Sequence, residues 1–151
     1  MGDLYETDLV AWSMEQAQAI RAAARDGANA PVDWDHVAEE IESLGIAERR
    51  ALASLIGTVI EHLLKLQASP ANDPVRLWRE SVRRARRRID RLLRDSPSLR
   101  RELPAIIAEE TVAARTLVRE TLADYGETPL RPLDTLVFDE VTLLGDWLPE
   151  R

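Results

Sequence analysis

Three side chains could carry chemistry because of their type and their place in apolar helical repeats. Glu48 and His62 belong to a repeat between Asp33 and Gln67, and Glu110 holds a similar inner position further along the chain. A carboxylate on the apolar side of a helix needs a cation or a hydrogen-bond donor, since an unpaired buried charge is costly. One hypothesis is therefore an acid/base or metal-assisted enzyme. The structural alternative is a carboxylate held by arginine and a half-packed histidine.

The spacing of these residues restricts that hypothesis. Glu48 and His62 are about 21 Å apart along one helix, so they share a ligand only if other helices contribute. Di-metal bundles use Glu-x-x-His pairs, and the chain contains none. His36 and Glu40 stand four residues apart, which permits shared coordination and equally suits a solvated pair. His36, Glu40 and His62 are thus the metal candidates, and we expect no cofactor.

A basic segment is the second candidate site. Residues 75–101 contain eleven arginines and three acids, a local charge of +8, whereas the whole chain carries −7 and the remainder −15. A basic stripe is typical of nucleic-acid binding, but the chain is acidic overall. We expect Arg84 to pair with Glu80, Arg86 and Arg94 to pair with Asp90, and the acids of residues 35–42 to dock against Arg83 or Arg87. The candidate binding surface comprises Arg83, Arg84, Arg87, Arg91, Glu39 and Glu40.

The elements that position these side chains are helices. The apolar spacing predicts one helix over residues 34–66 with at most a distortion at Gly45, since its phase of 100° per residue holds across the glycine. Asp33 is a suitable cap for it. The predicted inner stripe of this helix is Val37, Ile41, Leu44, Leu52, Leu55, Ile56, Val59, Leu63 and Leu66.

Three further long helices are predicted by the same period. They cover residues 8–25, with an inner stripe that includes Leu9, Trp12, Ala19, Ile20 and Ala23, residues 75–94, and residues 104–125, which Gly126 ends. A brief helix is expected around residues 133–141. The chain is therefore predicted to be an all-α single domain of residues 1–151, an antiparallel bundle of four main helices with one or two short extra helices.

The amino-terminal residues and the composition indicate a cytoplasmic protein. MGDLYETDLV has acids where a signal peptide has basic residues, and we expect no membrane-spanning segment. The absence of cysteine excludes disulfides and thiolate metal sites.

The chain contains the short motifs YETDLVAW (residues 5–12), DWDHVAEEIESLG (33–45), ERR (48–50), HLLK (62–65), SPSL (96–99) and DWLPE near the end. Together they resemble the motifs of a bacterial family known as domain of unknown function 29. Leu66 departs from the family pattern, in which an aromatic often follows HLLK, and RPLDTLVFDE matches the usual tail loosely. The resemblance implies a small all-helical protein with no established activity to carry over.

The functional prediction is a non-catalytic module that pairs with another protein or with itself. The enzyme built on His62 is the alternative, and nucleic-acid binding through residues 75–94 is the lesser one. If the basic helix meets the acidic helix start of a second copy, the chain should form a salt-sensitive dimer. Its aromatic anchors would be Trp12, Trp34, Trp78 and Trp147.

Overall fold

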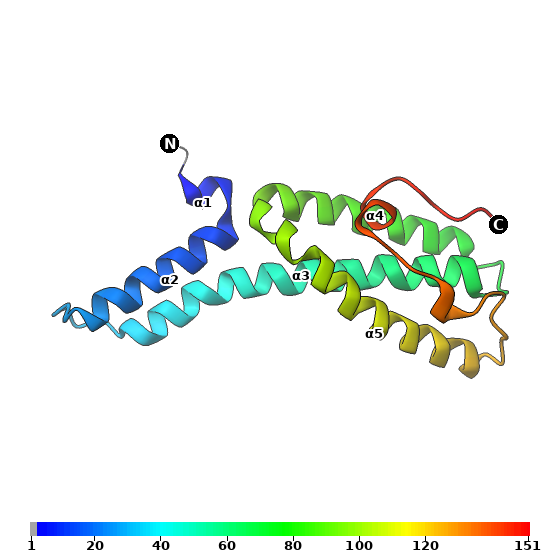
Figure 1. The fold of residues 1–151 in the computed structure, drawn as a ribbon, viewed down its shortest axis with the longest axis horizontal. Helices are drawn as coiled ribbons and strands as arrows, with labels where there is room; N and C mark the ends of the chain where they lie inside the picture. Colours follow the sequence, from blue (N-terminus) through cyan, green and yellow to red (C-terminus); the bar gives the residue numbers. More distant parts are fainter. Residues whose placement is uncertain (1–2) are drawn as a thin grey trace. The chain divides into compact units, whose positions relative to one another are not determined.

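The computed structural model describes residues 3–151, which contain helices and no strand (Figure 1). The predicted all-α class, with four long helices and short additional ones, is confirmed. In chain order the helices are α1 (Leu4–Thr7), α2 (Leu9–Arg25), α3 (Trp34–Ala68), α4 (Val75–Asp95), the 3-10 helix η1 (Pro97–Glu102), α5 (Leu103–Asp124), the 3-10 helix η2 (Leu133–Thr135) and α6 (Glu140–Leu144).

The chain divides into two compact units, and the boundary between them falls inside helices. Unit 1 comprises Met1–Ala51 and Leu92–Arg101, and unit 2 comprises Leu52–Arg91 and Glu102–Arg151. Both α3 and α4 contribute residues to each unit. The prediction that the chain forms a single domain stays a prediction.

Helix α3 is continuous from Trp34 to Ala68, which confirms the prediction that Gly45 does not break it. The Asp33 carboxylate accepts the backbone N–H of His36 at 3.4 Å, as expected for the residue that caps this end. Gly45 is buried because α2 packs closely on it. A Cβ atom at this position would lie 2.6 Å from Oγ of Ser13, so a larger residue would push the two helices apart.

Unit 1 is a helical hairpin of α2 and the first half of α3, closed at one end by residues 92–101. Small buried side chains form the contact between the two helices: Ser13 and Ala17 from α2, and Ala38 from α3. The predicted inner stripe is wrong in this half of α3. Val37 is 39% and Leu44 44% exposed, because the glycine and alanine positions, about 100° away around the helix, turn toward α2.

Asp8 joins the start of α2 to residues distant in sequence within unit 1. Its carboxylate accepts the N–H of Ala11 at 2.9 Å, which caps α2, and accepts both the backbone N–H and the hydroxyl of Ser98 at 2.7 and 2.9 Å. The buried Ser96 accepts the N–H of Val10 at 3.3 Å. The SPSL segment is therefore a hydrogen-bonding partner of the α2 start.

Unit 2 surrounds the second half of α3 with α4, α5 and the carboxyl-terminal segment. Ile60 and Leu64 lie outside the predicted stripe and are nevertheless fully buried, because helices pack on more than one side of α3 here. Among the described helices, α3 alone is long and apolar enough to cross a membrane by length and composition. Half of this apolar stretch is buried inside the structure, and the core helix of a soluble protein can be equally long and apolar.

The end of α5 agrees with the prediction from the sequence, whereas the carboxyl-terminal tail, residues 127–151, does not. Gly126 adopts φ 64°, and the N–H of Glu127 donates to the Leu122 carbonyl at 2.8 Å, as in a glycine-terminated helix. The brief helix expected over residues 133–141 is wrong, since η2 ends at Thr135 and α6 begins at Glu140. A capping box of Asp139 and Thr142 sets that later start.

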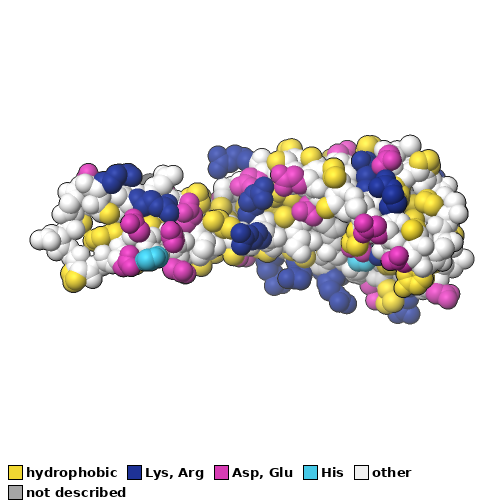
Figure 2. Space-filling view, turned by 90° about the horizontal axis from the view of Figure 1, so that it is seen from below, with side chains coloured by type: hydrophobic (Ala, Val, Ile, Leu, Met, Phe, Trp, Pro, Cys, Tyr) yellow, Lys and Arg dark blue, Asp and Glu magenta, His cyan; other side chains and the backbone are white. Residues whose placement is uncertain are grey.

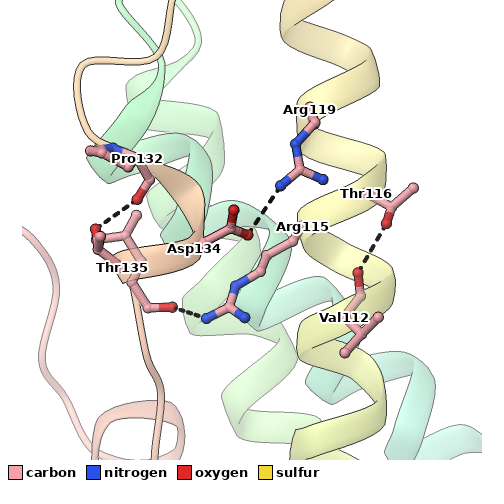
Figure 3. Close-up of polar contacts among 8 residues, drawn as sticks. Val112, Arg115, Thr116, Arg119, Pro132, Asp134 and Thr135 are labelled. Atoms are coloured by element: carbon pink, nitrogen blue, oxygen red, sulfur yellow. Dashed lines mark hydrogen bonds and ion pairs between the residues drawn. The ribbon is translucent and has the colours of Figure 1, made fainter.

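Arginines of α4 and α5 hold the tail through its backbone carbonyls. Arg86 donates from Nε to the Leu143 carbonyl at 2.8 Å and from Nη2 to the Thr142 carbonyl at 2.7 Å. Arg115 donates to the Leu136 carbonyl at 2.7 Å, and Arg119 pairs with Asp134 at 3.1 Å (Figure 3). These contacts attach the tail, with its short elements η2 and α6, to α4 and α5.

Candidate functional site

His62 lies half-buried on α3 in unit 2, and its ring has an unusual polar environment. Nδ1 is buried and has no hydrogen-bond partner within residues 3–151. Burial lowers the pKa of His62, and the nearby charge of Glu61 only partly opposes this effect. His62 is therefore neutral at neutral pH, and the half-packed position predicted from the sequence is observed without the predicted hydrogen bond at Nδ1.

Glu110 is half-buried on α5 and lies against the backbone of α3. A Cβ atom at Gly57 would be only 2.6 Å from Oε2 of Glu110, so the absence of a side chain at residue 57 makes room for the carboxylate. The predicted arginine or hydroxyl partner is wrong, since no hydrogen bond or ion pair reaches Glu110 from the described residues. Burial, and then the charge of Glu109, raise the pKa of Glu110.

Replacing Glu110 by glutamine should raise the melting temperature slightly at pH 8. The folded state holds the proton of this acid more tightly than the unfolded state. Its carboxylate therefore costs stability once the pH rises through the raised pKa, and this cost is absent below the unfolded pKa. The gain from glutamine should disappear at acidic pH. Thermal unfolding of both proteins at several pH values checks this, and a gain that grows on acidification would contradict it.

Glu48, the other inner glutamate, is half-buried in unit 1 and makes no hydrogen bond or ion pair with residues 3–151. It belongs to unit 1, whereas His62 and Glu110 belong to unit 2. The shallow hollow of about 220 Å³ beside Glu110 is lined by residues that include Ser54 and Glu61 but not His62. The three candidate chemical residues are thus not gathered into one site.

The metal candidates are also apart. The exposed His36 pairs through Nδ1 with Asp33 at 2.6 Å, which raises the pKa of His36, so its ring partner is Asp33 and not Glu40. Within residues 3–151 no group of three or more histidine, aspartate or glutamate side chains is placed to hold a metal ion.

A cavity that the sequence did not indicate lies in unit 2, at the ends of α3 and α5 and the start of α4. Its volume is about 370 Å³, and Trp78 and Tyr125 contribute aromatic surface to it. Several of the polar side chains that line it already have partners. Lys65 pairs with Glu61 at 2.6 Å, and the carboxylate of Glu127 accepts the Ser69 hydroxyl at 3.2 Å.

The arginines of α4 fall into two groups. Arg86, and also Arg79, which donates to the Pro149 carbonyl at 3.3 Å, lie half-buried against the tail. The predicted pair of Glu80 with Arg84 is wrong, because Glu80 pairs with Arg76 at 3.1 Å. Within unit 1, Glu42 pairs with Arg21 at 2.7 Å, and the docking of residues 35–42 on Arg83 or Arg87 stays a prediction.

The second group is exposed and forms what we call the arginine face. Within the described residues, none of its side chains makes a hydrogen bond or an ion pair. Glu39 and Glu40, the acidic members of the predicted binding surface, are likewise exposed on α3 in unit 1. On the face drawn in Figure 2, acidic, basic and hydrophobic side chains are interspersed. The arginine face consists of Arg83, Arg84, Arg87, Arg88 and Arg91.

The structure defines the class: an all-helical protein whose candidate chemical groups lie apart and which carries a basic helical surface. The chain belongs to the DUF29 family, since the model for "Domain of unknown function DUF29" matches residues 4–137, which confirms the predicted resemblance. No curated protein matches the chain.

The fold is also that of a solved structure, an alpha-helical protein of unknown function from Rhodospirillum rubrum. The two chains share 24% identity with a TM-score of 0.78, and the likeness covers 97% of this chain and 92% of the other. At this identity the likeness establishes the fold.

Proposed function

We propose that this protein is a non-catalytic interaction module that docks on an acidic surface of another protein through the arginine face. The observation that carries the proposal is the set of five exposed arginines on one helix with no partner among the described residues. Arg83 and Arg87, Arg84 and Arg88, and Arg87 and Arg91 are like-charge pairs one helical turn apart, which destabilise a helix. Acidic groups on a partner would relieve this repulsion.

The opposite side of α4 keeps the arginine face turned outward. Val82, Ala85 and Ile89 are buried in unit 2 with exposed fractions of at most 4%. Rotation of the helix would expose this apolar surface, so the arginines are fixed in place over about 12 Å of helix. A rigid row of guanidinium groups suits carboxylates, with which arginine forms paired hydrogen bonds.

The charge of the whole chain favours a protein partner over a nucleic acid. The net charge is −7, so a polyanion meets repulsion from the rest of the molecule, whereas an acidic patch on a protein can contact the arginine face alone. We place this role in the bacterial cytoplasm, which suits the cysteine-free composition.

Charge reversal on the arginine face tests the proposal. The variant Arg83→Glu, Arg84→Glu, Arg87→Glu should fold like the wild type and lose its partner, because acidic groups would then face acidic groups. Affinity capture from the native host at low salt, quantified by mass spectrometry, should show a stoichiometric acidic protein that the variant no longer retains. The retained amount should fall as salt rises.

The matched control reverses three exposed arginines elsewhere: Arg25→Glu, Arg101→Glu, Arg131→Glu. It has the same net charge as the variant and should retain the partner. Equal loss in both proteins would show a general charge effect and contradict a specific face. Salt-dependent binding of a DNA duplex that only the α4 variant loses, without any captured protein, would favour the nucleic-acid alternative.

A further inference from the structure

The helical hairpin of unit 1 leaves an apolar strip open on one side. Its two helices touch through a narrow line of small residues, and the ion pair of Arg21 with Glu42 at 2.7 Å closes one edge of that contact. Successive residues of a helix are turned by about 100° around its axis. Relative to the buried Ala17 and Ala38, the positions at the edge away from Arg21 and Glu42 carry apolar side chains on both helices.

These apolar side chains are the ones that the sequence predicts to face a core. Val37 and Leu44 are 39% and 44% exposed, Ala19 is exposed, and Ile41 and Trp12 are half-buried. The Trp12 ring is held edge-on by Tyr5, with ring centroids 4.9 Å apart. We call this surface the hairpin strip: Trp12, Ala19 and Ala23 from α2, and Val37, Ile41 and Leu44 from α3.

We propose that a second copy of this chain covers the hairpin strip, with the two hairpins face to face and their loops at opposite ends. A two-fold axis perpendicular to the helices, at the level of Ile41, relates the copies. The result is a four-helix arrangement in which each hairpin supplies two helices. The proposal does not involve the arginine face, which belongs to unit 2.

The residue numbers of the strip fit such an axis on both helices at once. The contact of Gly45 with Ser13 fixes the register of the two antiparallel helices. A residue of α2 and a residue of α3 therefore lie at the same level when their numbers add to 58, as 13 and 45 do. An axis midway between Val37 and Leu44 on α3 then lies at residues 17 and 18 of α2. That level is also midway between Trp12 and Ala23.

The pairing that follows is complementary in shape. Val37 meets the partner's Leu44, and Ile41 lies against its own copy beside the axis. On the other helix, Trp12 meets the partner's Ala23, so that a large side chain faces a small one. Loops at opposite ends also keep the two Glu48 carboxylates about 20 Å apart, whereas loops side by side would bring them to the same level.

The size of the strip fits a weak dimer. Helix α2 has 17 residues, a length of about 25 Å, and two helices are about 20 Å wide. Such a face covers about 500 Å², which is less than the roughly 800 Å² per partner of a standard interface and lies in the range of a weak dimer. Glu40 lies at the rim of the strip and close to the axis, so that it faces Glu40 of the second copy. Salt should therefore maintain or strengthen this dimer, unlike a contact made by arginines.

Sedimentation equilibrium on the full chain tests the inference. The wild type should be dimeric at about 100 µM, and Ile41→Glu should weaken the dimer at least about 100-fold, because it places two charges beside the axis in an apolar contact. The matched control is Ile46→Glu, which changes an exposed residue on a different side of the same helix, 42% exposed. It should stay dimeric, and circular dichroism should show both variants helical.

Cysteine cross-linking supplies a test that does not depend on the stability of a charge variant. The chain has no cysteine, so Ile41→Cys should form a disulfide-linked dimer on mild oxidation and Ile46→Cys should not. A monomeric wild type, or equal effects at residues 41 and 46, would overturn the inference. Loss of the dimer only in the α4 charge-reversal variant would assign the contact to the arginine face, and binding to neutral lipid vesicles in place of dimerisation would assign the strip to a membrane.

Discussion

Replacing Asp8 by alanine should lower the free energy of unfolding by about 3 kcal/mol, which corresponds to a fall in melting temperature of about 6–12 °C. The carboxylate is 9% exposed and accepts three hydrogen bonds, one from the start of α2 and two from Ser98. Alanine would leave the N–H groups of Ala11 and Ser98 without their acceptor in a partly buried place. Thermal unfolding followed by circular dichroism measures the effect.

The control is Asp3→Ala, the same substitution at another helix start. Asp3 accepts the N–H of Tyr5 at 3.1 Å, but this contact is exposed and local, so the loss should stay within about 1 kcal/mol. Combining Asp8→Ala with Ser98→Ala should cost less than the sum of the two single changes, because both remove the same contact. Strict additivity would mean that the Asp8–Ser98 link contributes nothing beyond the cap.

Replacing Arg86 by methionine should lower the free energy of unfolding by about 2–3 kcal/mol and release the tail around α6. Arg86 is half-buried, and burial lowers its pKa, although an arginine stays charged at any physiological pH. Methionine can fill the space of the aliphatic stem. It cannot donate to the carbonyls of Thr142 and Leu143, which would lose their charged donor.

Limited proteolysis checks this result, since cleavage between residues 136 and 151 should become faster in the variant. Arg87→Met is the matched control, because Arg87 is the next residue of the same helix, is exposed, and belongs to the arginine face. Its effect on stability should lie within about 0.5 kcal/mol. If both substitutions had equal effects, the contacts of Arg86 with the tail would not stabilise unit 2.

These two arginines show why a count of charges could not assign roles on α4. Both belong to a run of like residues, and a difference of one position, about 100° around the helix, separates a structural donor from an exposed cation. The sequence predicts correctly that this segment is a basic amphipathic helix. Only the position of the tail decides which of its arginines are occupied.

The sequence alone determined the four long helices and their ends, because those signals are local. The apolar period of α3, the cap at Asp33, and Gly126 after α5 act through residues within one or two turns, and the structure confirms all three. The all-α class follows from the same signals, and so does the resemblance to the DUF29 family.

The tertiary structure alone decided which surfaces are covered and which polar groups meet. An apolar period indicates which face of a helix is apolar but not what packs on it. Val37 and Leu44 are therefore predicted as core residues, whereas α2 packs on the neighbouring face of α3 through Ser13 and Ala17. Asp8 and Ser98 are 90 residues apart, and nothing local to either residue marks the link. The Glu110 carboxylate lies against Gly57, where the absence of a side chain leaves room for it. This fit exists only once α3 and α5 pack together.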